Sequence, residues 1–366
     1  MRTILLIAIA STFCSCRLNV GSEAPGAGER VKPDLADTTE LHLKNLHQLT
    51  YGGNNTKPHF SYNHRNVVFQ SDFHKWGVTC DQVFIFDLAH AEHDTAIPHM
   101  LSTGLGTTAD CYFMQDGGHI VYASSHLSDE NCLHPIPWKA KNGQYLKGLH
   151  DDHDIFVTNL NGKPTEQLTS SPGYDAEAKT SPKGNKIVFT SNRSGDPELY
   201  TMNIDGSDVK RITNRIGYDG VASFSPDGSK LVFQSTRPKT KEAIENYRSL
   251  LKQGLVDQTH TEIYTCNADG TNLRQVTALG KTNLHPFYHP GGKKIIFSSN
   301  HRSEQNDGYQ LFTINDDGSN LEQITSESTF NAFPMFSFDG KKLIFCSKRN
   351  NGGTQQINIF VADWVD

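Results

Sequence analysis

A repeated unit is the sequence feature that most restricts the possible folds of this chain. Its clearest copy runs from Phe224 to Thr277, beginning with FSPDGSKLVF and ending with EIYTCNADGTNLRQVT. Each half holds two β-rich runs joined through an Asp-Gly pair, where glycine supplies the positive φ that a tight hairpin needs. Two hairpins make a four-stranded antiparallel sheet, and such a sheet repeated along a chain is typical of a β-propeller blade.

The first hairpin of this unit recurs six times. Its copies begin at Phe60, Phe113, Thr180, Phe224, Tyr288 and Phe336. The sixth copy stops one strand short, and the missing strand is found at the other end of the chain, where NLHQLT (45–50) resembles NLRQVT (272–277). The sequence therefore predicts an all-β, six-bladed propeller of four-stranded antiparallel blades, closed by residues 43–50 pairing beside residues 357–363 in one blade.

Charge and composition narrow the classes of partner. The net charge is −6, with positive and negative residues interspersed, so nucleic acid and anionic membrane surfaces are not indicated as partners. Hydrophobic residues make up 36% of the chain, and we expect each strand to bury one face while polar residues alternate on the other.

The first residues read as a targeting segment rather than as part of the fold. An apolar run at 4–10 follows Arg2 and is too short to span a bilayer. We predict a lipoprotein-type signal peptide at 1–16 with acylation of Cys16, a flexible tether at 17–40 and a propeller at 41–366. Simple secretion stays open as an alternative to the anchored form. In either case we expect an exported protein, periplasmic or attached to the outer membrane, that touches the membrane only through Cys16.

Export permits disulfide bonds, and three cysteines lie near strand ends and inserts of the first two blades. They are Cys80, Cys111 and Cys132. We predict that Cys111 pairs with Cys132 or with Cys80. Cys266 and Cys346 fall inside predicted strands and are expected to be buried thiols.

Four inserts interrupt the blades between their second and third strands. They occupy residues 72–79, 126–152, 238–261 and 301–308. Since connections at the same point of a blade emerge on the same face, these inserts should crowd one rim of the channel. The third insert predicts a helix with Ile244, Tyr247 and Leu251 on one side, whereas the second reads as irregular. Loops this long in a compact domain are often binding loops.

Aligning the blades gives two polar columns at the starts of the innermost strands. The first column is Asn55, Thr108, Asp175, Asp219, Asn283 and Asn331. Its uniformity favours turn chemistry, because Asp and Asn bond their own backbone at such junctions. The second column is Lys57, Asp110, Glu177, Val221, His285 and Phe333. Its mixture of acids, bases and aromatics at a channel mouth is what a specific ligand site would need.

A third column follows the second strand of each blade. It consists of Phe73, His126, Arg193, Arg237, His301 and Arg349. Two interpretations stay open: each arginine pairs with an acid of a neighbouring blade, or the arginines form a clamp for ligand carboxylates. On the second interpretation the predicted contact residues are Asp110, Glu177, Arg193, Arg237, His285, His301 and Arg349, with Trp138 and Tyr145 as apolar anchors.

A metal site has weaker support in the sequence. His126, His285 and His301 could converge around a divalent metal, but no local ligand spacing such as HExxH accompanies them. We therefore predict no cofactor. The chain also contains no GxSxG, Walker or dinucleotide-binding motif, and no catalytic residue is predicted.

The recurring FSPDG…LVF and IYTxNADGTNLRQVT patterns resemble the WD40-like repeats of the TolB family of periplasmic propellers, over about residues 41–366. The resemblance implies a non-catalytic scaffold whose channel mouth accepts a protein segment. TolB itself carries an α/β domain before its propeller, which the segment before residue 41 is expected to be too short to hold. Related propellers include oligogalacturonate lyases, which place histidines and a metal in the propeller.

Two functions follow. The favoured one is a non-catalytic envelope scaffold that grips a protein or peptide partner by the insert-bearing face, within an envelope transport or secretion complex. The alternative is a metal-dependent propeller enzyme, such as a lyase acting on acidic oligosaccharides.

Overall fold

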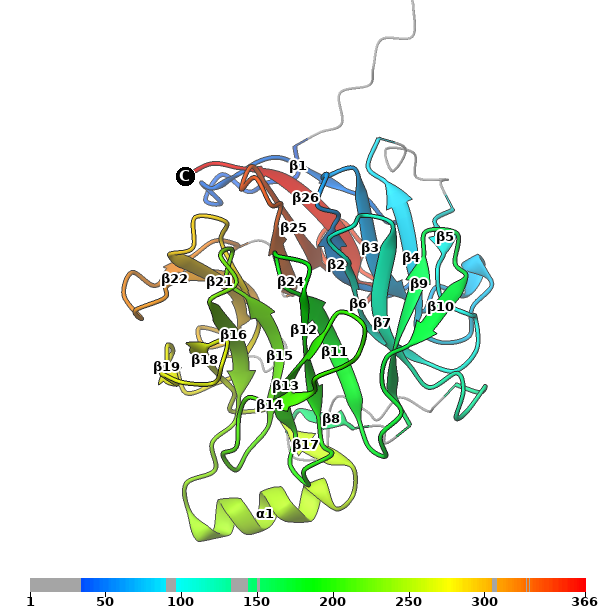
Figure 1. Ribbon diagram of the computed structural model, residues 1–366. Coiled ribbons are helices and arrows are strands. Elements are labelled where there is room, and N and C mark those ends of the chain that lie inside the picture. Colours follow the sequence, from blue (N-terminus) through cyan, green and yellow to red (C-terminus); the bar gives the residue numbers. More distant parts are fainter. Residues whose placement is uncertain are drawn as a thin grey trace, which may run out of the picture. The chain divides into compact units, whose positions relative to one another are not determined.

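Six four-stranded antiparallel sheets follow one another along the chain and form the blades of a propeller (Figure 1). The computed structural model describes residues 34–89, 97–132, 144–149, 152–304, 308–326, 328 and 330–366. The first three blades consist of β2 (Asn55–Phe60), β3 (Asn66–Ser71), β4 (Gln82–Asp87) and β5 (His99–Met100); β6 (Thr108–Phe113), β7 (His119–Ser124), β9 (Asp154–Asn159) and β10 (Pro164–Gln167); and β11 (Asp175–Thr180), β12 (Lys186–Ser191), β13 (Glu198–Asn203) and β14 (Lys210–Arg211).

The remaining blades follow the same order. They consist of β15 (Asp219–Phe224), β16 (Lys230–Ser235), β18 (Glu262–Asn267) and β19 (Arg274–Gln275); β20 (Asn283–Tyr288), β21 (Lys294–Ser299), β22 (Gln310–Asn315) and β23 (Glu322–Gln323); and β24 (Asn331–Phe336), β25 (Lys342–Ser347), β26 (Asn358–Trp364) and β1 (Leu43–Gln48). The first strand of each blade contacts the first strand of the next, and β2 contacts both β6 and β24. These inner strands therefore surround a central channel.

The predicted closure is confirmed. In Figure 1, β1 runs beside β26, with Leu43 opposite Trp364 and Gln48 opposite Phe360. A side-chain bond also repeats across the closure: Thr50 Oγ1 donates to Asn358 Oδ1 at 3.2 Å, as Thr277 Oγ1 donates to Glu262 Oε2 at 2.6 Å in blade four. The N-terminal strand thus supplies the outer strand of blade six and covers an edge that would otherwise be exposed.

The Asp-Gly hairpins form for the reason predicted. In blade four, Gly228 has a φ of 73° and its N–H donates to Ser225 O at 2.8 Å. The Asp227 carboxylate accepts from the Ser229 N–H at 3.0 Å. A residue that tolerates positive φ, next to an acid that bonds the following backbone, is what this turn requires.

The expected alternation of buried and exposed residues is wrong. In β16 and β21 every residue after the first is buried, and Phe233 and Phe297 are completely enclosed. Each blade packs between two others, so both faces of its sheet are covered. Buried sheets of this kind carry continuous apolar runs instead of alternating ones.

The inserts leave the blades between the second and third strands, as predicted. The third insert forms helix α1 (Lys241–Leu251), which Thr240 caps by accepting a hydrogen bond from the Ala243 N–H at 3.1 Å. The second insert is more regular than expected, because β8 (Leu146–Gly148) pairs with β17 (Leu255–Asp257) of the third insert. We call this two-stranded sheet the lid ribbon. It lies near α1 in Figure 1.

A disulfide joins the first two inserts. Cys80 and Cys132 are bonded, and the first insert also contains the short helix η1 (His74–Trp76). The prediction that Cys111 takes part is wrong. Cys111 is a free, buried thiol on β6, packed in the apolar cluster between the first two blades, where no other cysteine reaches it.

The propeller begins before residue 41, inside the range predicted as a tether. Leu35 N–H donates to Leu46 O at 2.8 Å, and Leu35 and Ala36 pack against the core. Residues 34–40 therefore belong to the propeller. Met1–Pro33, with the predicted signal peptide and Cys16, lie outside the described residues. Within the described residues, no helix has the length and apolar character that crossing a membrane requires.

Candidate functional site

The second polar column forms a ring of left-handed residues at the channel. Lys57, Asp110, Glu177, Val221, His285 and Phe333 all have positive φ, between 51° and 61°. Each lies where the pairing of an inner strand with its neighbour shifts register, so each is a bulge residue. We call this set the channel ring.

Side chains from one blade hold the bulges of the next. The N–H of Asp110 donates to Gln70 Oε1 at 2.9 Å, and the N–H of His285 donates to Gln234 Oε1 at 2.9 Å. The N–H of Val221 donates to Glu177 Oε2 at 2.7 Å. The left-handed backbone is thus fixed by specific acceptors.

Left-handed backbone is costly for such residues. A non-glycine residue with positive φ is uncommon, and a β-branched residue such as Val221 is an outlier. Each such residue costs on the order of 1–3 kcal/mol, and strain of this kind gathers at binding and active sites. Six repetitions without a glycine make the channel ring the strongest candidate site in the described chain.

Charges of opposite sign meet in one part of the ring. Lys57 Nζ lies 3.0 Å from Asp110 Oδ2, and the Asp110 side chain is only 6% exposed. Burial opposes ionisation of Asp110, but the charges of Lys57, Lys147 and Lys179 outweigh it and hold the pKa of Asp110 at about 2. Asp110 is therefore a carboxylate at any physiological pH.

Glu177 anchors the lid ribbon instead of facing an open site. It is 1% exposed and accepts hydrogen bonds from Tyr218 Oη at 2.8 Å, from Thr190 Oγ1 at 2.6 Å and from Lys147 Nζ. Lys147 comes from β8, so one ion pair ties the ribbon to the inner strands. Burial and the charge of Lys57 lower the pKa of Lys147 to about 7, while the contact with Glu177 favours its ammonium form. A carboxylate with this many donors has little capacity left for a ligand.

Tyr145 also serves the lid ribbon. It is buried, its ring lies 6.1 Å from that of Tyr309, and the two pack with Leu284 and Phe330. Its backbone carbonyl accepts from the Gln258 N–H at 2.7 Å. The predicted apolar anchor for a partner is therefore an internal contact. Trp138, the second predicted anchor, lies outside the described residues.

The other half of the ring is more accessible. His285 and Phe333 are partly exposed, with ring centroids 4.2 Å apart. Burial, with the charge of Lys57, lowers the pKa of His285 well below its usual value, so the imidazole is neutral. Its Nδ1 is buried without a hydrogen-bond partner among the described residues. His285 and Phe333 together offer a polar group and an apolar face to a ligand.

Sequence reasoning missed a second layer of the channel. His59, Tyr112 and Lys179 occupy matching positions on their inner strands, just after the bulges. The rings of His59 and Tyr112 are 5.0 Å apart, and Lys179 is 5% exposed. The layer could have been found in the sequence, because polar residues occupy the same register position in three consecutive inner strands.

The arginine column is paired internally. Arg193 Nη2 lies 2.6 Å from Asp175 Oδ2, and Arg237 Nη2 lies 2.6 Å from Asp219 Oδ1. Both acids belong to the first polar column and to the same blade as their arginine, so the expected pairing with a neighbouring blade is wrong. These bonds also correct the predicted clamp, because the guanidiniums already hold buried carboxylates.

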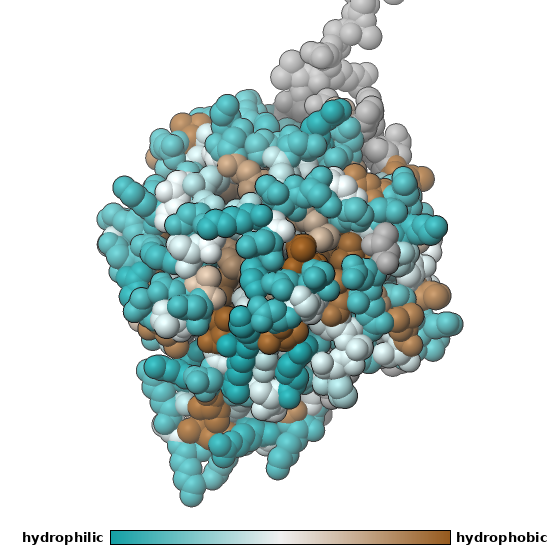
Figure 2. Space-filling model, viewed as in Figure 1, coloured by the Kyte–Doolittle hydropathy of each residue, from teal (hydrophilic) through white to brown (hydrophobic). Residues whose placement is uncertain are grey.

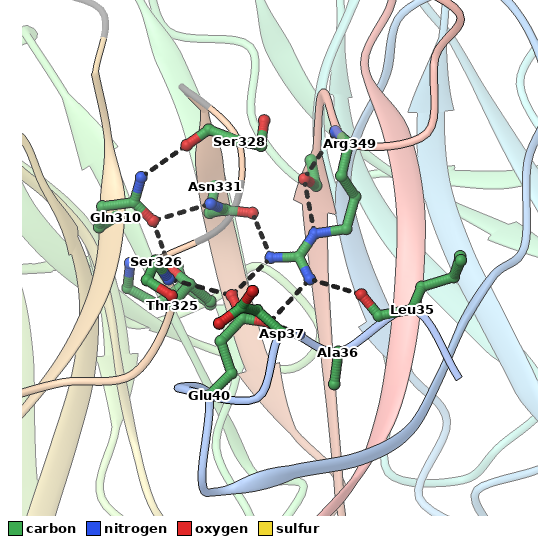
Figure 3. A network of polar contacts seen from close by, with 12 residues as sticks. Leu35, Ala36, Asp37, Glu40, Gln310, Thr325, Ser326, Ser328, Asn331 and Arg349 are labelled. Carbon is green, nitrogen blue, oxygen red and sulfur yellow. Dashed lines mark hydrogen bonds and ion pairs between the residues drawn. The ribbon is translucent and has the colours of Figure 1, made fainter. Parts of the chain in front are cut away.

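Arg349 completes the same pattern with a partner from the N-terminal segment (Figure 3). Its Nη1 and Nη2 each donate to a Glu40 oxygen at 2.9 Å, and Nη2 also donates to Asn331 Oδ1 at 3.1 Å. Glu40 in turn accepts from the Ser326 N–H at 3.0 Å. Arg349 is 4% exposed. Arg349 is a structural link between blades five and six and residues 35–40, so it is an internal contact instead of the predicted ligand contact.

The histidines of the third column do not converge on His285. Nδ1 of His126 lies 3.0 Å from Ser124 Oγ, and Nδ1 of His301 lies 2.9 Å from Ser299 Oγ. Each imidazole packs on a phenylalanine of its own blade. In the part of the chain that the structure describes, no three His, Cys, Asp or Glu side chains are placed to share a metal ion. The suggested convergence of His126, His285 and His301 is therefore wrong.

A hollow of about 390 Å³ lies away from the ring, in blade five. It is lined by Ser299, Arg302, Ser303, Glu304, Gly308, Gln310, Phe312, Gln323 and Ser328. Arg302 Nη1 donates to Gln323 Oε1 at 3.0 Å and its guanidinium lies over the ring of Phe312. Its charged group is thus already engaged, and the strained ring remains the better candidate.

Comparisons with known proteins agree with this architecture. The family model of the Tricorn protease N-terminal β-propeller domain matches residues 149–259. No curated protein matches the sequence. Among solved structures, a TolB protein from Agrobacterium tumefaciens is 17% identical, with 86% of this chain and 91% of that chain covered and a TM-score of 0.52.

Two further structures show the same likeness. TolB from Acinetobacter baumannii is 18% identical with a TM-score of 0.53, and the match covers 86% of this chain but 64% of that protein. An oligogalacturonate lyase from Vibrio parahaemolyticus is 13% identical with a TM-score of 0.54, covering 90% of this chain and 96% of that one. Identities this low show the fold alone. The comparisons thus confirm the resemblance read from the repeats: this chain has the six-bladed propeller fold of TolB-like proteins.

Proposed function

We propose that this protein is a non-catalytic binding module of the cell envelope, which takes up a segment of a protein or peptide partner at its channel mouth. The observation that carries the proposal is the channel ring, where six blades hold six chemically different side chains on left-handed backbone. A purely structural ring would not need this strain at every blade. A site that must present specific groups to a ligand would.

The accessible half of the ring suits a polypeptide segment. His285 and Phe333 supply two rings in contact, tilted by 45° to each other, and Lys57, 24% exposed, supplies a charge beside them. On the face that Figure 2 shows, the surface is mostly hydrophilic and hydrophobic residues form small separate patches. That face therefore favours no broad apolar docking, whereas a mouth that combines charge with aromatic rings can bind side chains and backbone together.

Export is part of the proposal. The Cys80–Cys132 disulfide supports it, because disulfides persist in oxidising compartments such as the periplasm. Lipidation of Cys16 would attach the propeller to a membrane without a spanning helix. The TolB-like fold favours a place in an envelope transport or secretion complex.

Site-specific photocrosslinking tests the proposal. Benzoylphenylalanine placed at Phe333 should crosslink in cells to one protein, and the same group at Arg65, an exposed residue in the hairpin turn of blade one, should not. The crosslinked protein, once purified, should bind wild type and lose about tenfold or more in affinity for a His285→Ala/Phe333→Ala variant. Equal crosslinking at both positions, or equal affinity for the folded variant, would place the binding surface elsewhere.

The same protein can be tested for the alternative activity. Incubation with acidic oligosaccharides and a divalent metal should leave the substrate unchanged. Release of products with the ultraviolet absorbance of an unsaturated sugar would show β-elimination and would overturn the non-catalytic assignment.

A further inference from the structure

Lys179 is a buried cation to which the described structure gives no partner. It lies on inner strand β11 opposite Val188 and is 5% exposed. Among the described residues, no hydrogen bond or ion pair reaches its ammonium group. Buried charges in proteins are normally paired or bound to a ligand, because an isolated charge loses its hydration without compensation. This position therefore favours an anionic ligand.

The charges of the channel do not balance. Among the described residues, three ammonium groups, those of Lys57, Lys147 and Lys179, share it with the carboxylates of Asp110 and Glu177. Lys57 pairs with Asp110 and Lys147 pairs with Glu177. One positive charge, that of Lys179, is left over.

The neighbours of Lys179 in this layer carry no negative charge. Burial, with the charge of Lys179, lowers the pKa of His59 to about 3, so its imidazole is neutral. The ring of His59 lies 5.0 Å from that of Tyr112. Nδ1 of His59 contacts Met335 Sδ at 3.3 Å, and because a thioether can only accept, the single N–H of the neutral imidazole is already engaged. Burial raises the pKa of the Tyr112 phenol well above its usual value, so Tyr112 is neutral too. The donors for an anion are therefore the three N–H groups of the Lys179 ammonium.

We propose that the channel binds a carboxylate group at Lys179, in the layer just after the channel ring. The proposal rests on the binding function proposed above and names the chemistry of that site. A single negative charge matches the single excess positive charge, and the two oxygens of a carboxylate can accept from the three N–H groups of the ammonium. The carboxylate could belong to a bound polypeptide or to a small free acid, and the chemistry at Lys179 is the same. Burial lowers the pKa of Lys179 to about 8, which leaves the ammonium charged at neutral pH.

Acetate is the first probe. The full chain is titrated with sodium acetate in exchange for sodium chloride at constant ionic strength, and melting temperature and binding heat are measured. Wild type should show a saturable rise in melting temperature. A Lys210→Met control, at an ammonium 63% exposed on the surface, should respond as wild type does. Lys179→Met should bind acetate at least about tenfold more weakly, as expected on losing a charge-assisted hydrogen bond.

A second variant keeps the test decisive if Lys179→Met does not fold. Asp110→Asn removes one channel carboxylate and should strengthen acetate binding, a gain that damage to the fold would not produce. An absent saturable response in wild type, an unchanged response in folded Lys179→Met, or weaker binding by folded Asp110→Asn would each overturn the proposal.

The two sources of the carboxylate separate with a matched peptide pair. A short peptide with a free C-terminal carboxylate that binds at least about tenfold more tightly than its amide and than acetate identifies a polypeptide. Equal affinity of peptide acid and acetate identifies a small free acid. A partner that crosslinks at Phe333 equally in wild type and in Lys179→Met, with no acetate response in either, would remove the carboxylate site and leave the proposed binding function standing.

Discussion

The arginine column and the channel ring are both repeated blade by blade, yet the two regions treat charge in opposite ways. Arg193, Arg237 and Arg349 each hold a carboxylate that is at most 1% exposed. In the channel, Lys179 has no partner among the described residues, and the ring backbone is strained. In the arginine column the charges form ion pairs that hold the blades together. In the channel the charge of Lys179 is available to a ligand.

Whether a charged side chain already has a partner inside the protein separates structural from functional side chains better than its residue type does. In sequence the arginines were the more obvious ligand clamp, because guanidinium groups bind carboxylates well. In the structure that capacity is used inside the protein. Removing one partner of a buried ion pair destabilises the fold, because the other charge stays buried without compensation. A buried charge that has no partner in the free protein instead suggests that a ligand supplies one.

The most severe way to break the paired region is to remove its N-terminal partner together with the closing strand. Deleting residues 1–50 removes Glu40 and β1 and exposes the edge of β26. We expect aggregation, measured by light scattering and size-exclusion chromatography. Deleting only residues 1–33 leaves every contact of the described propeller in place and serves as the control. A monomeric 1–50 deletion with unchanged melting would contradict the closure.

A single substitution in the paired region should have the next largest effect. Arg349→Met leaves the Glu40 carboxylate buried without its guanidinium, and breaking such a pair from one side costs about 3–5 kcal/mol of unfolding free energy. Denaturant titration measures it. Glu322→Ala, at a half-exposed partner of His42, should cost less than about 1 kcal/mol. Similar losses of unfolding free energy in both variants would show that the Arg349–Glu40 pair stabilises the fold no more than an exposed ion pair does.

The sequence predicted the architecture because the repeat encodes it locally. Hairpin turns such as that at Asp227-Gly228, the inserts, helix α1 and the closure beside β26 all follow from short-range patterns and from counting copies. The pairing of β8 with β17 could not be read in the same way. It joins two inserts that are far apart in the chain and carry no repeat.

The sequence predicted part of the candidate site. The features that it did not predict depend, like the pairing of β8 with β17, on contacts in space that the repeat does not encode. The second column placed Asp110 and His285 in the channel, because alignment of the blades fixes register. Alignment says nothing about partners. It could not show that Glu177 pairs with Lys147, that Arg237 holds Asp219, or that Lys179 has no acceptor in the described part of the chain, since each of these facts depends on how side chains meet in space.

A smaller loss is expected where the channel has its own pair. Asp110→Asn should lower the unfolding free energy by about 2 kcal/mol at pH 7, because the folded pKa of Asp110 is about 2 against 3.8 in the unfolded chain. A depressed carboxyl pKa stabilises above the unfolded value and loses this contribution as pH falls through the folded one. The difference between wild type and variant should therefore shrink between pH 3.8 and 2 in denaturant titrations. A difference that stays constant across this window would mean that the Asp110 charge is not involved.

An effect of similar or smaller size, but of the opposite sign, is expected at Lys179. Lys179→Met removes an unpaired buried ammonium, so it should raise the unfolding free energy at pH 7 by about 1–3 kcal/mol, whereas Arg349→Met lowers it. The folded pKa of Lys179 is about 8 and its ordinary value is 10.5. Between these values the unfolded chain binds more protons, so this lysine makes wild-type stability rise with pH, and the variant should lack that part of the rise. Lys147, with a pKa near 7, adds a rise of the same sign in both proteins, so the difference between them isolates Lys179.

Denaturant titrations from pH 7 to 10, without added carboxylate, measure this difference in unfolding free energy. If Lys179→Met proves less stable than wild type throughout this range, the ammonium has a partner in the free protein, and the contrast between the two regions fails.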